Sequence, residues 1–446
     1  MLWHRSLFVG ALVSSAAGLL ACTGDDTVVA PPDGGADASL GYDAQGFETG
    51  AFDATELQGD SGNLGADAGS PPPARLLLSN GTATQSELAV FGLHSGTVDG
   101  RLVTPGPLGT SVATSSSPWL LEPTDDLVAR LDPIQPWIVR STWNVALGDA
   151  TDAGFAVPYS YPDAIVLGAG TNAYVLRYTR NRIAVIDTSI DVDGGVPSST
   201  IDLSAQVQAG GDGYVEMTAA TFDPSSNLAY VLLGNLNRFD VASDGHTLLC
   251  ASTQPTVVAI DTTQNALAPF GDAGTGGVAL QGYAPPLGPS SMVFDPAGDR
   301  LLVIESGCNG PATDAGPGPV VRRGIEAVSL VDGSVTQLLD LTAQSSPSGL
   351  FYVDQHHVIV QLTAGAFMWD PASTMLGAAI PGAPQSFALD GQGNLVGVAV
   401  ATAEAGAGAA SVVSVDPTDG GVTLLGQNPF MLSGGTVGGV QLWPQQ

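Results

Sequence analysis

The 446-residue sequence contains no lysine, only three cysteines and few aromatic residues. All 12 basic residues are therefore arginines, and they stand against 43 acidic residues, which gives a formal net charge of −31. A surface this acidic repels nucleic acids and anionic membrane surfaces, so both are excluded as electrostatic partners. Aromatic residues make up only 6% of the chain. Valine, leucine and alanine are plentiful instead, which suits thin, repetitive β packing.

Long apolar runs are also missing, except near the start of the chain. Arg5 precedes an uncharged stretch of apolar and small residues at positions 6–21. This stretch is shorter than the roughly 20 residues that span a bilayer, and it fits the apolar core of an export signal. It ends in Leu-Leu-Ala followed by Cys22, an aliphatic-small-cysteine pattern.

This ending resembles the lipobox of bacterial lipoproteins. The resemblance implies that Cys22 is lipidated, that the signal at 1–21 is removed and that the protein is anchored in the cell envelope. Two or more acyl chains give stable anchoring. Thr23 stands where some bacteria read an inner-membrane retention aspartate, so we expect the outer membrane. The alternatives are an ordinary cleaved signal and an uncleaved membrane helix.

Apolar clusters are absent from the next segment. Residues 23–73 contain ten acidic residues, no basic residue and many glycines, alanines and prolines. Such a segment cannot bury enough surface to offset its chain entropy. We therefore predict that 22–73 is a lipidated cysteine plus a disordered tether, and that 74–446 is the folded domain.

After residue 73, one pattern recurs: a proline or its substitute, an apolar strand, an aspartate-centred turn and a second apolar strand. Its clearest copies are GPSSMVFDPAGDRLLVI (288–304), SPSGLFYVDQHHVIV (346–360), APQSFALDGQGNLVGV (383–398) and MTAATFDPSSNLAYVL (217–232). Aspartate caps such turns, and glycine or proline sets their backbone angles. Further strands follow, as in TVVAIDTTQ (256–264). Each repeat thus predicts about four antiparallel strands, the blade of a β-propeller.

The repeats also give a blade count. First strands are expected near residues 117, 161, 217, 289, 347 and 384. Two runs at 74–80 and 87–95 lack a first strand, and 435–443 is a lone strand. Their pairing would close a seventh blade and remove the exposed sheet edge. We therefore predict an all-β, seven-bladed propeller and a monomer, with six or eight blades as alternatives.

Several repeats resemble the YVTN-type, lactonase-like propeller repeats, most closely NAYVLRYTRNRIAVIDTSI (172–190). The resemblance covers most of 160–445 and implies the fold. Lactonase-like propellers use polar residues in the central channel, whereas Glu216 is the single acid among the residues that open the first strands here. The sequence contains no Gly-x-Ser-x-Gly, His-Glu-x-x-His or phosphate-loop motif. It therefore predicts no catalytic residue, cofactor or metal.

The two remaining cysteines, Cys250 and Cys308, follow the second strands of adjacent repeats, so their loops should lie side by side. Export places them in an oxidising compartment, where disulfides persist. We predict a disulfide between them, with two separate thiols as the alternative.

Six arginines fall around the connections between second and third strands of three neighbouring repeats. They are Arg177, Arg180, Arg182, Arg238, Arg322 and Arg323. In propellers these connections open on the face where ligands usually bind. Guanidinium groups clustered there predict a site for a carboxylate, sulfate or phosphate. Pairing with nearby acids such as Asp240, Glu305 and Glu326 is the alternative.

The leading functional interpretation is non-enzymatic binding or scaffolding at the cell envelope, with an envelope protein or an anionic small ligand as the partner. One alternative is an enzyme of lactonase or hydrolase type with its site in the central channel. Another is a structural surface protein without a small ligand. Convergence of Glu216 with other polar groups in the central channel would favour the enzyme, and arginines that face solvent unpaired would favour the binder.

Overall fold

The computed structural model describes residues 75–81, 85–93, 95–105, 110–113, 117–123, 125–146, 160–241, 248–310, 318–382, 384, 386–389, 395–402, 408–416, 421–425, 430–431 and 436–443. The predicted export signal, Cys22 and the predicted tether lie outside these residues. Within the described part of the chain, no helix has the length and apolarity needed to cross a membrane.

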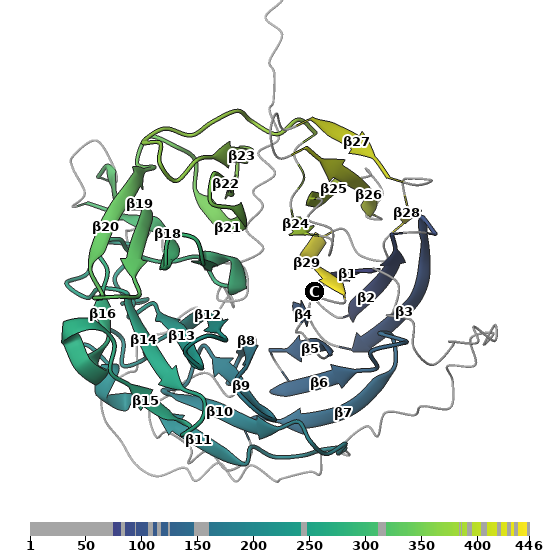
Figure 1. Ribbon diagram of the computed structural model, residues 1–446, viewed down its shortest axis with the longest axis horizontal. Coiled ribbons are helices and arrows are strands. Elements are labelled where there is room, and N and C mark those ends of the chain that lie inside the picture. The colour runs from purple at the N-terminus through teal and green to yellow at the C-terminus, as the bar shows by residue number, and fades with distance from the viewer. Residues whose placement is uncertain are drawn as a thin grey trace, which may run out of the picture. The chain divides into compact units, whose positions relative to one another are not determined.

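Seven antiparallel sheets follow one another around a ring, as Figure 1 shows. From the innermost strand outward, the first sheet contains β29 (Thr436–Trp443), β1 (Arg75–Gly81), β2 (Gln85–Gly92) and β3 (Thr97–Pro105). The second contains β4 (Thr110–Ala113), β5 (Pro118–Glu122), β6 (Leu127–Leu131) and β7 (Val139–Asn144). The third contains β8 (Pro162–Leu167), β9 (Asn172–Arg177), β10 (Arg182–Asp187) and β11 (Ser199–Asp202). The fourth contains β12 (Met217–Asp223), β13 (Leu228–Leu233), β14 (Thr256–Asp261) and β15 (Ala266–Ala268), with β16 (Val278–Ala279) also pairing with β14.

The remaining sheets continue the ring in chain order. The fifth contains β17 (Met292–Asp295), β18 (Arg300–Asn309), β19 (Val320–Ser329) and β20 (Val335–Asp340). The sixth contains β21 (Pro347–Asp354), β22 (His357–Leu362) and β23 (Gly365–Trp369). The seventh contains β24 (Ser386–Leu389), β25 (Leu395–Thr402), β26 (Gly408–Val415) and β27 (Val422–Leu424), with β28 (Phe430–Met431) pairing with β26. Short 3₁₀ turns occur at Ser204–Gln206, Gly271–Gly276 and Pro289–Ser291. The prediction of an all-β, seven-bladed propeller is confirmed.

The ring closes where the two ends of the domain meet. Strand β29 pairs antiparallel with β1 over its whole length, from Trp443 opposite Arg75 to Thr436 opposite Gly81. The innermost strands contact one another in the order β29, β4, β8, β12, β17, β21, β24 and again β29. The last strand of the chain is thus the innermost strand of the first sheet, and it covers an edge of β1 that would otherwise be open.

The predicted strand order of the second sheet was wrong by one strand. The run at 117–131, expected to supply the first two strands, forms β5 and β6, which are the second and third. The innermost strand, β4, is the short segment Thr110–Ala113. Its sequence TSVA has one branched apolar residue, so it gives a much weaker strand pattern than the run that follows it.

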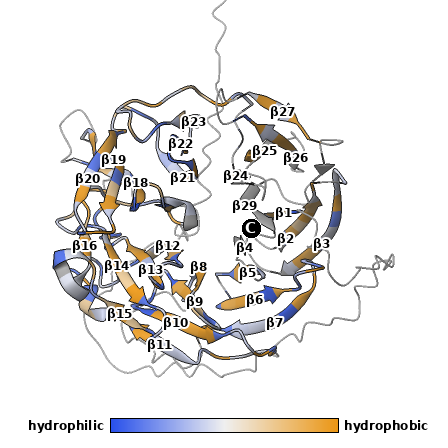
Figure 2. Ribbon diagram, viewed as in Figure 1, coloured by the Kyte–Doolittle hydropathy of each residue, from blue (hydrophilic) through white to orange (hydrophobic). Residues whose placement is uncertain are grey.

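Apolar clusters fill the spaces between neighbouring sheets. Along β13, for example, Ala229, Val231 and Leu233 pack toward the third sheet, whereas Tyr230 and Leu232 pack toward the fifth. Successive residues of a strand point to opposite faces, and here both faces are covered. This is why the middle strands read as nearly continuous apolar runs, which appear orange in Figure 2.

Candidate functional site

One end of the third, fourth and fifth sheets carries most of the residues singled out in the sequence. In the third sheet, Pro162 at the start of β8 pairs with Arg177 at the end of β9. In the fourth, Met217 at the start of β12 pairs with Leu233 at the end of β13. Hydrogen bonds between Asn181 and the 213–215 segment join these two ends. We call this the disulfide end, defined by residues 160–163, 177–182, 212–217, 234–241, 248–255, 306–310 and 318–323.

Glu216 lies at the disulfide end, immediately before the innermost strand β12. Its side chain is fully buried and its backbone has a left-handed φ of +43°. Oε2 accepts a hydrogen bond of 2.8 Å from the N–H of Leu236, and Oε1 lies 3.5 Å from Nε of Arg238. Burial, and then the neighbouring carboxylate of Asp212, raise the pKa of Glu216 well above its usual range. The surroundings of Glu216 therefore favour its protonated form.

Arg238 links the polar groups around Glu216. Its Nε donates to Asp212, and its guanidinium lies 5.6 Å from the ring centroid of Tyr178 and 5.1 Å from that of Tyr214. The Arg238 side chain remains 21% exposed, whereas those of Asp212 and Glu216 are fully buried. Arg238 is thus the member of this group that meets solvent.

A second acid occupies the neighbouring innermost strand. Asp163 is the second residue of β8, the strand that contacts β12. Burial raises its pKa to about 8, partly offset by a hydrogen bond from the backbone of Gly288, and its Oδ2 has no hydrogen-bond partner. Two buried carboxyl groups with raised pKa values thus occupy the same end of adjacent innermost strands, a grouping typical of functional sites.

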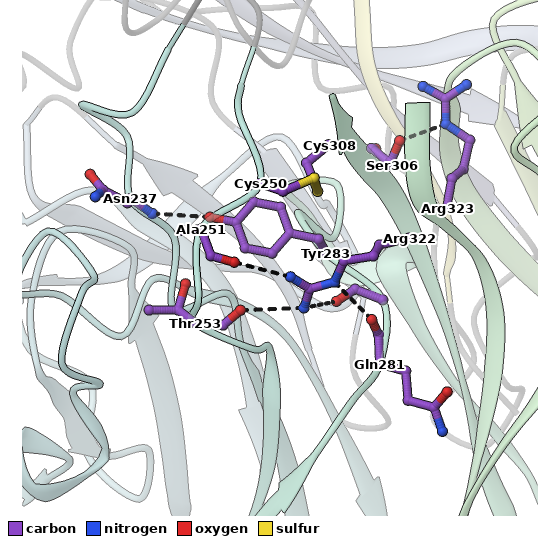
Figure 3. The surroundings of a disulfide bond; sticks show 11 residues. Asn237, Cys250, Ala251, Thr253, Gln281, Tyr283, Ser306, Cys308, Arg322 and Arg323 are labelled. Atoms are coloured by element: carbon purple, nitrogen blue, oxygen red, sulfur yellow. Dashed lines mark hydrogen bonds between the residues drawn. A yellow bond between two sulfur atoms is a disulfide. The ribbon is translucent and has the colours of Figure 1, made fainter. Parts of the chain in front are cut away.

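The cysteines join the fourth and fifth sheets at this end (Figure 3). Cys250 and Cys308 form a disulfide with a Cα–Cα distance of 5.0 Å. Cys308 lies within β18 rather than after it, because that strand extends to Asn309. The N–H of Cys250 also donates to the carbonyl of Asn309. The long connection between β13 and β14 is therefore fixed to the neighbouring sheet.

The six arginines of the predicted anion site mostly contact protein acceptors. Arg177 is fully buried and donates to the carbonyls of Arg182 and Val145. Arg180 donates to Thr179. Arg182 is exposed, and its charge helps to lower the pKa of Asp202.

The other three arginines also contact acceptors within the protein. Arg238 pairs with Asp212 and Glu216 rather than with Asp240. Arg322 and Arg323 donate to backbone carbonyls of neighbouring segments. The guanidinium groups thus hold connections together, and Arg182 is the exposed one among the six.

The sequence did not predict Asp163, Asp212 and Tyr283 as residues of the site. Asp163 carries a usable signal, since it is an acid inside the apolar run YPDAIVL (161–167). Asp212 stands in a glycine-rich loop and carries no such signal. Tyr283 becomes significant only through its place beside Arg322, 4.8 Å from ring centroid to guanidinium.

The opposite end of the fifth and sixth sheets holds a cavity of about 240 Å³. Two of its lining residues, Asp295 and Arg300, are paired with each other at 2.7 Å, and residues 297–298, 355–356 and 371–372 complete the wall. His356 there is 62% exposed. No cluster of three or more His, Cys, Asp or Glu suited to a metal ion occurs in the ranges that the structure describes.

Comparisons with known proteins identify the fold. No protein-family model matches the chain, and no curated protein matches its sequence. A putative 6-phosphogluconolactonase from Bacteroides uniformis has a TM-score of 0.50 and 12% identity over 84% of this chain and 100% of that chain. A periplasmic gluconolactonase from Pseudomonas aeruginosa has a TM-score of 0.49 and 14% identity over 83% and 98%. A putative 6-phosphogluconolactonase from Bacteroides fragilis has 0.48 and 12% over 84% and 99%. At these identities the likeness shows the fold alone.

Proposed function

We propose that this protein is a hydrolase of lactonase type, with its reaction site at the disulfide end of the innermost strands. The observation that carries the proposal is the group formed by Glu216, Asp212 and Arg238: two adjacent carboxyl groups and a guanidinium within 3.5 Å of both. Asp163 on the neighbouring innermost strand adds a third carboxyl group. The lactonase names of the similar folds agree with this chemistry.

The reaction needs one acid, one base and one positive charge. Water adds to the carbonyl carbon of the lactone, the ring C–O bond breaks, and the ring oxygen receives a proton to give the hydroxy acid. A protonated Glu216 can give that proton, and Asp212 beside it can take the proton that water loses. Transfer between the two carboxyl groups restores the starting state. Arg238 supplies positive charge for the oxyanion and then for the product carboxylate.

Access to the site runs through Arg238. It is the exposed member of the group, so a substrate would meet its guanidinium first. The rings of Tyr178 and Tyr214 hold that guanidinium by cation–π contacts, so little reorganisation is needed when negative charge develops.

Non-enzymatic binding at the envelope is the second candidate. The observation that favours it is Phe239, which follows Arg238 and is 81% exposed. An exposed aromatic residue beside an arginine is typical of a protein contact. In this reading the same end of the ring binds an envelope protein without turnover.

The proposal includes the location of the protein. The lipobox-like ending implies anchoring through Cys22, and we propose that the tether carries the propeller on the outer membrane, outside the cytoplasm. Mass measurement of the protein from membranes, compared with the Cys22→Ser variant, tests the lipid attachment. If the wild-type protein carries no acyl chains, the proposed lipid anchoring through Cys22 is contradicted.

The hydrolase proposal is tested on the purified full-length protein with a panel of sugar and aliphatic lactones, using acid release as the readout. We expect at least one lactone to open faster with the protein than in buffer, and Arg238→Gln to lose this rate. Arg140→Gln is the matched control, because Arg140 also pairs with an aspartate, Asp132, but lies in β7 of the second sheet. If every lactone in the panel opens at the same rate with the protein as in buffer, the hydrolase proposal is contradicted and non-enzymatic binding is the remaining candidate function.

A further inference from the structure

Arg322 joins three segments at the disulfide end. It lies near the start of β19, in a left-handed backbone conformation with φ of +55°. Its guanidinium donates to the carbonyls of Gln281 and Gly282 at 2.9 and 2.8 Å, and to those of Ala251 and Thr253 at 3.3 Å. Figure 3 shows this fan of contacts beside the disulfide. We call these four hydrogen bonds the Arg322 clamp.

A buried acid lies against the clamp. Glu305 on β18 is fully buried, and neither of its carboxyl oxygens has a hydrogen-bond partner. The carboxyl packs on the α-carbon of Gly282, where an added Cβ would come within 2.3 Å of Cδ of Glu305. The same Gly282 offers its carbonyl to Arg322. Glu305 and the clamp thus share one residue as their neighbour.

Three other charged residues lie around Glu305: Glu326, Arg323 and Arg322. Glu326 on β19 repels it, and accepts the N–H of Gln281 at 3.0 Å. Arg323 is directed to the carbonyls of Ser306 and Gln344. Arg322 is the cation that acts on Glu305. Burial, and then Glu326, raise the pKa of Glu305 well above its usual range, which favours the neutral carboxyl in this structure.

We propose that Glu305 is a proton switch for the Arg322 clamp: the neutral carboxyl leaves Arg322 on the four carbonyls, and the ionised carboxylate draws Arg322 away and loosens residues 248–255, while the Cys250–Cys308 disulfide stays in place. A buried carboxylate without a partner is costly. A carboxylate adds the attraction of an opposite charge to the hydrogen bonds of a guanidinium, and it can accept two of them in parallel, which a single carbonyl cannot do. When Glu305 loses its proton, the guanidinium of Arg322 therefore binds the Glu305 carboxylate in preference to the four carbonyls.

The loosened segment leads to the proposed reaction site. The carbonyl of Gln254 accepts from Nδ2 of Asn235 at 3.3 Å, and the N–H of Leu249 donates to the carbonyl of Asp240 at 2.9 Å. Both contacts lie close in sequence to Leu236 and Arg238, which contact Glu216. Regulation of that site rests on the proposed function, whereas the clamp and its switch do not.

Hydrogen exchange of residues 248–255 in the full-length protein, followed by mass spectrometry over a pH series, tests the switch. Wild type and Glu305→Gln are compared at the same pH, so that the intrinsic pH dependence of exchange cancels. We expect equal exchange at acid pH, and an excess in wild type that grows by up to about tenfold per pH unit as Glu305 ionises. Arg322→Gln should exchange fast at every pH, because it lacks the clamp.

Asp163→Asn is the matched control, since it also removes a buried acid, in β8 of the third sheet. It should exchange like wild type over residues 248–255. Equal exchange in wild type and Glu305→Gln at every pH would overturn the switch, and slow exchange in Arg322→Gln would overturn the clamp. Both readouts are taken without substrate, so a protein that opens no lactone but shows the predicted exchange would refute the hydrolase and leave the switch standing.

Discussion

The Nε atom of Arg238 lies 3.5 Å from Oε1 of Glu216, at the point where the chain enters the innermost strand of the fourth sheet. The partner atom Oε2 is held by the N–H of Leu236, two residues before Arg238. One short segment of the β13–β14 connection thus provides both contacts to this buried carboxyl. Movement of that connection would change the charge and the orientation of Glu216 together.

Asp163 should make the protein less stable as pH rises. Its pKa is about 8 in the folded protein, whereas an aspartate in an unfolded chain ionises near pH 4. Between these values the folded state binds the extra proton, so the free energy of unfolding falls by about 1.4 kcal/mol per pH unit. Asp163→Asn cannot ionise and still offers an oxygen to Gly288, so it should lose this part of the pH dependence.

Urea unfolding of wild type and Asp163→Asn at several pH values measures this effect. The variant should gain stability relative to wild type steadily from pH 5 to pH 8. A constant difference between the two proteins over that range would show that Asp163 is ionised throughout.

The disulfide should contribute substantially to stability. Cys250 and Cys308 are separated by 58 positions, for which the chain-entropy model gives about 4 kcal/mol. We expect Cys250→Ser/Cys308→Ser to unfold at clearly lower denaturant concentration than wild type. Wild type with reductant should match the double variant, and an unchanged midpoint in both cases would contradict the prediction.

The C-terminal strand should be essential for closing the ring. Truncation before Thr436 removes β29, which pairs with β1 and contacts β4 and β24. The truncated protein should expose strand edges and aggregate, as measured by size-exclusion chromatography and yield. Truncation after Trp443 keeps all of β29 and serves as the control. A monomeric, cooperatively unfolding protein without β29 would show that closure does not depend on this strand.

The fold was readable from the sequence because its repeats carry alternating apolar strands and aspartate turns. The pairing of 435–443 with the first strands follows from the count of strands alone. Strand β4 was not predicted, because its sequence TSVA at 110–113 contains few apolar residues. The sequence thus predicts elements whose two faces are buried, and fails where a strand is short and weakly apolar.

The site was less predictable, because its partners are set by loops that meet only in the folded ring. Glu216 and the arginines could be singled out, but Arg238 meets Asp212, a residue of a glycine-rich loop, and not the nearby Asp240. The Arg322 clamp depends on backbone carbonyls, which every residue carries, so no side-chain pattern could reveal it. The disulfide could be predicted from the sequence, because equivalent loops of adjacent repeats lie side by side.

The most direct test of the account is kcat/KM for lactone opening by wild type and Glu216→Gln, measured side by side with their thermal unfolding. Glutamine keeps an acceptor for Leu236 N–H and is neutral, like the protonated Glu216, so the fold should be preserved. We expect an unchanged Tm and a loss of about 10²–10⁴-fold in kcat/KM, the range expected for removal of a general acid. Equal kcat/KM in the two proteins would contradict the proposed role of Glu216 and the site built around it.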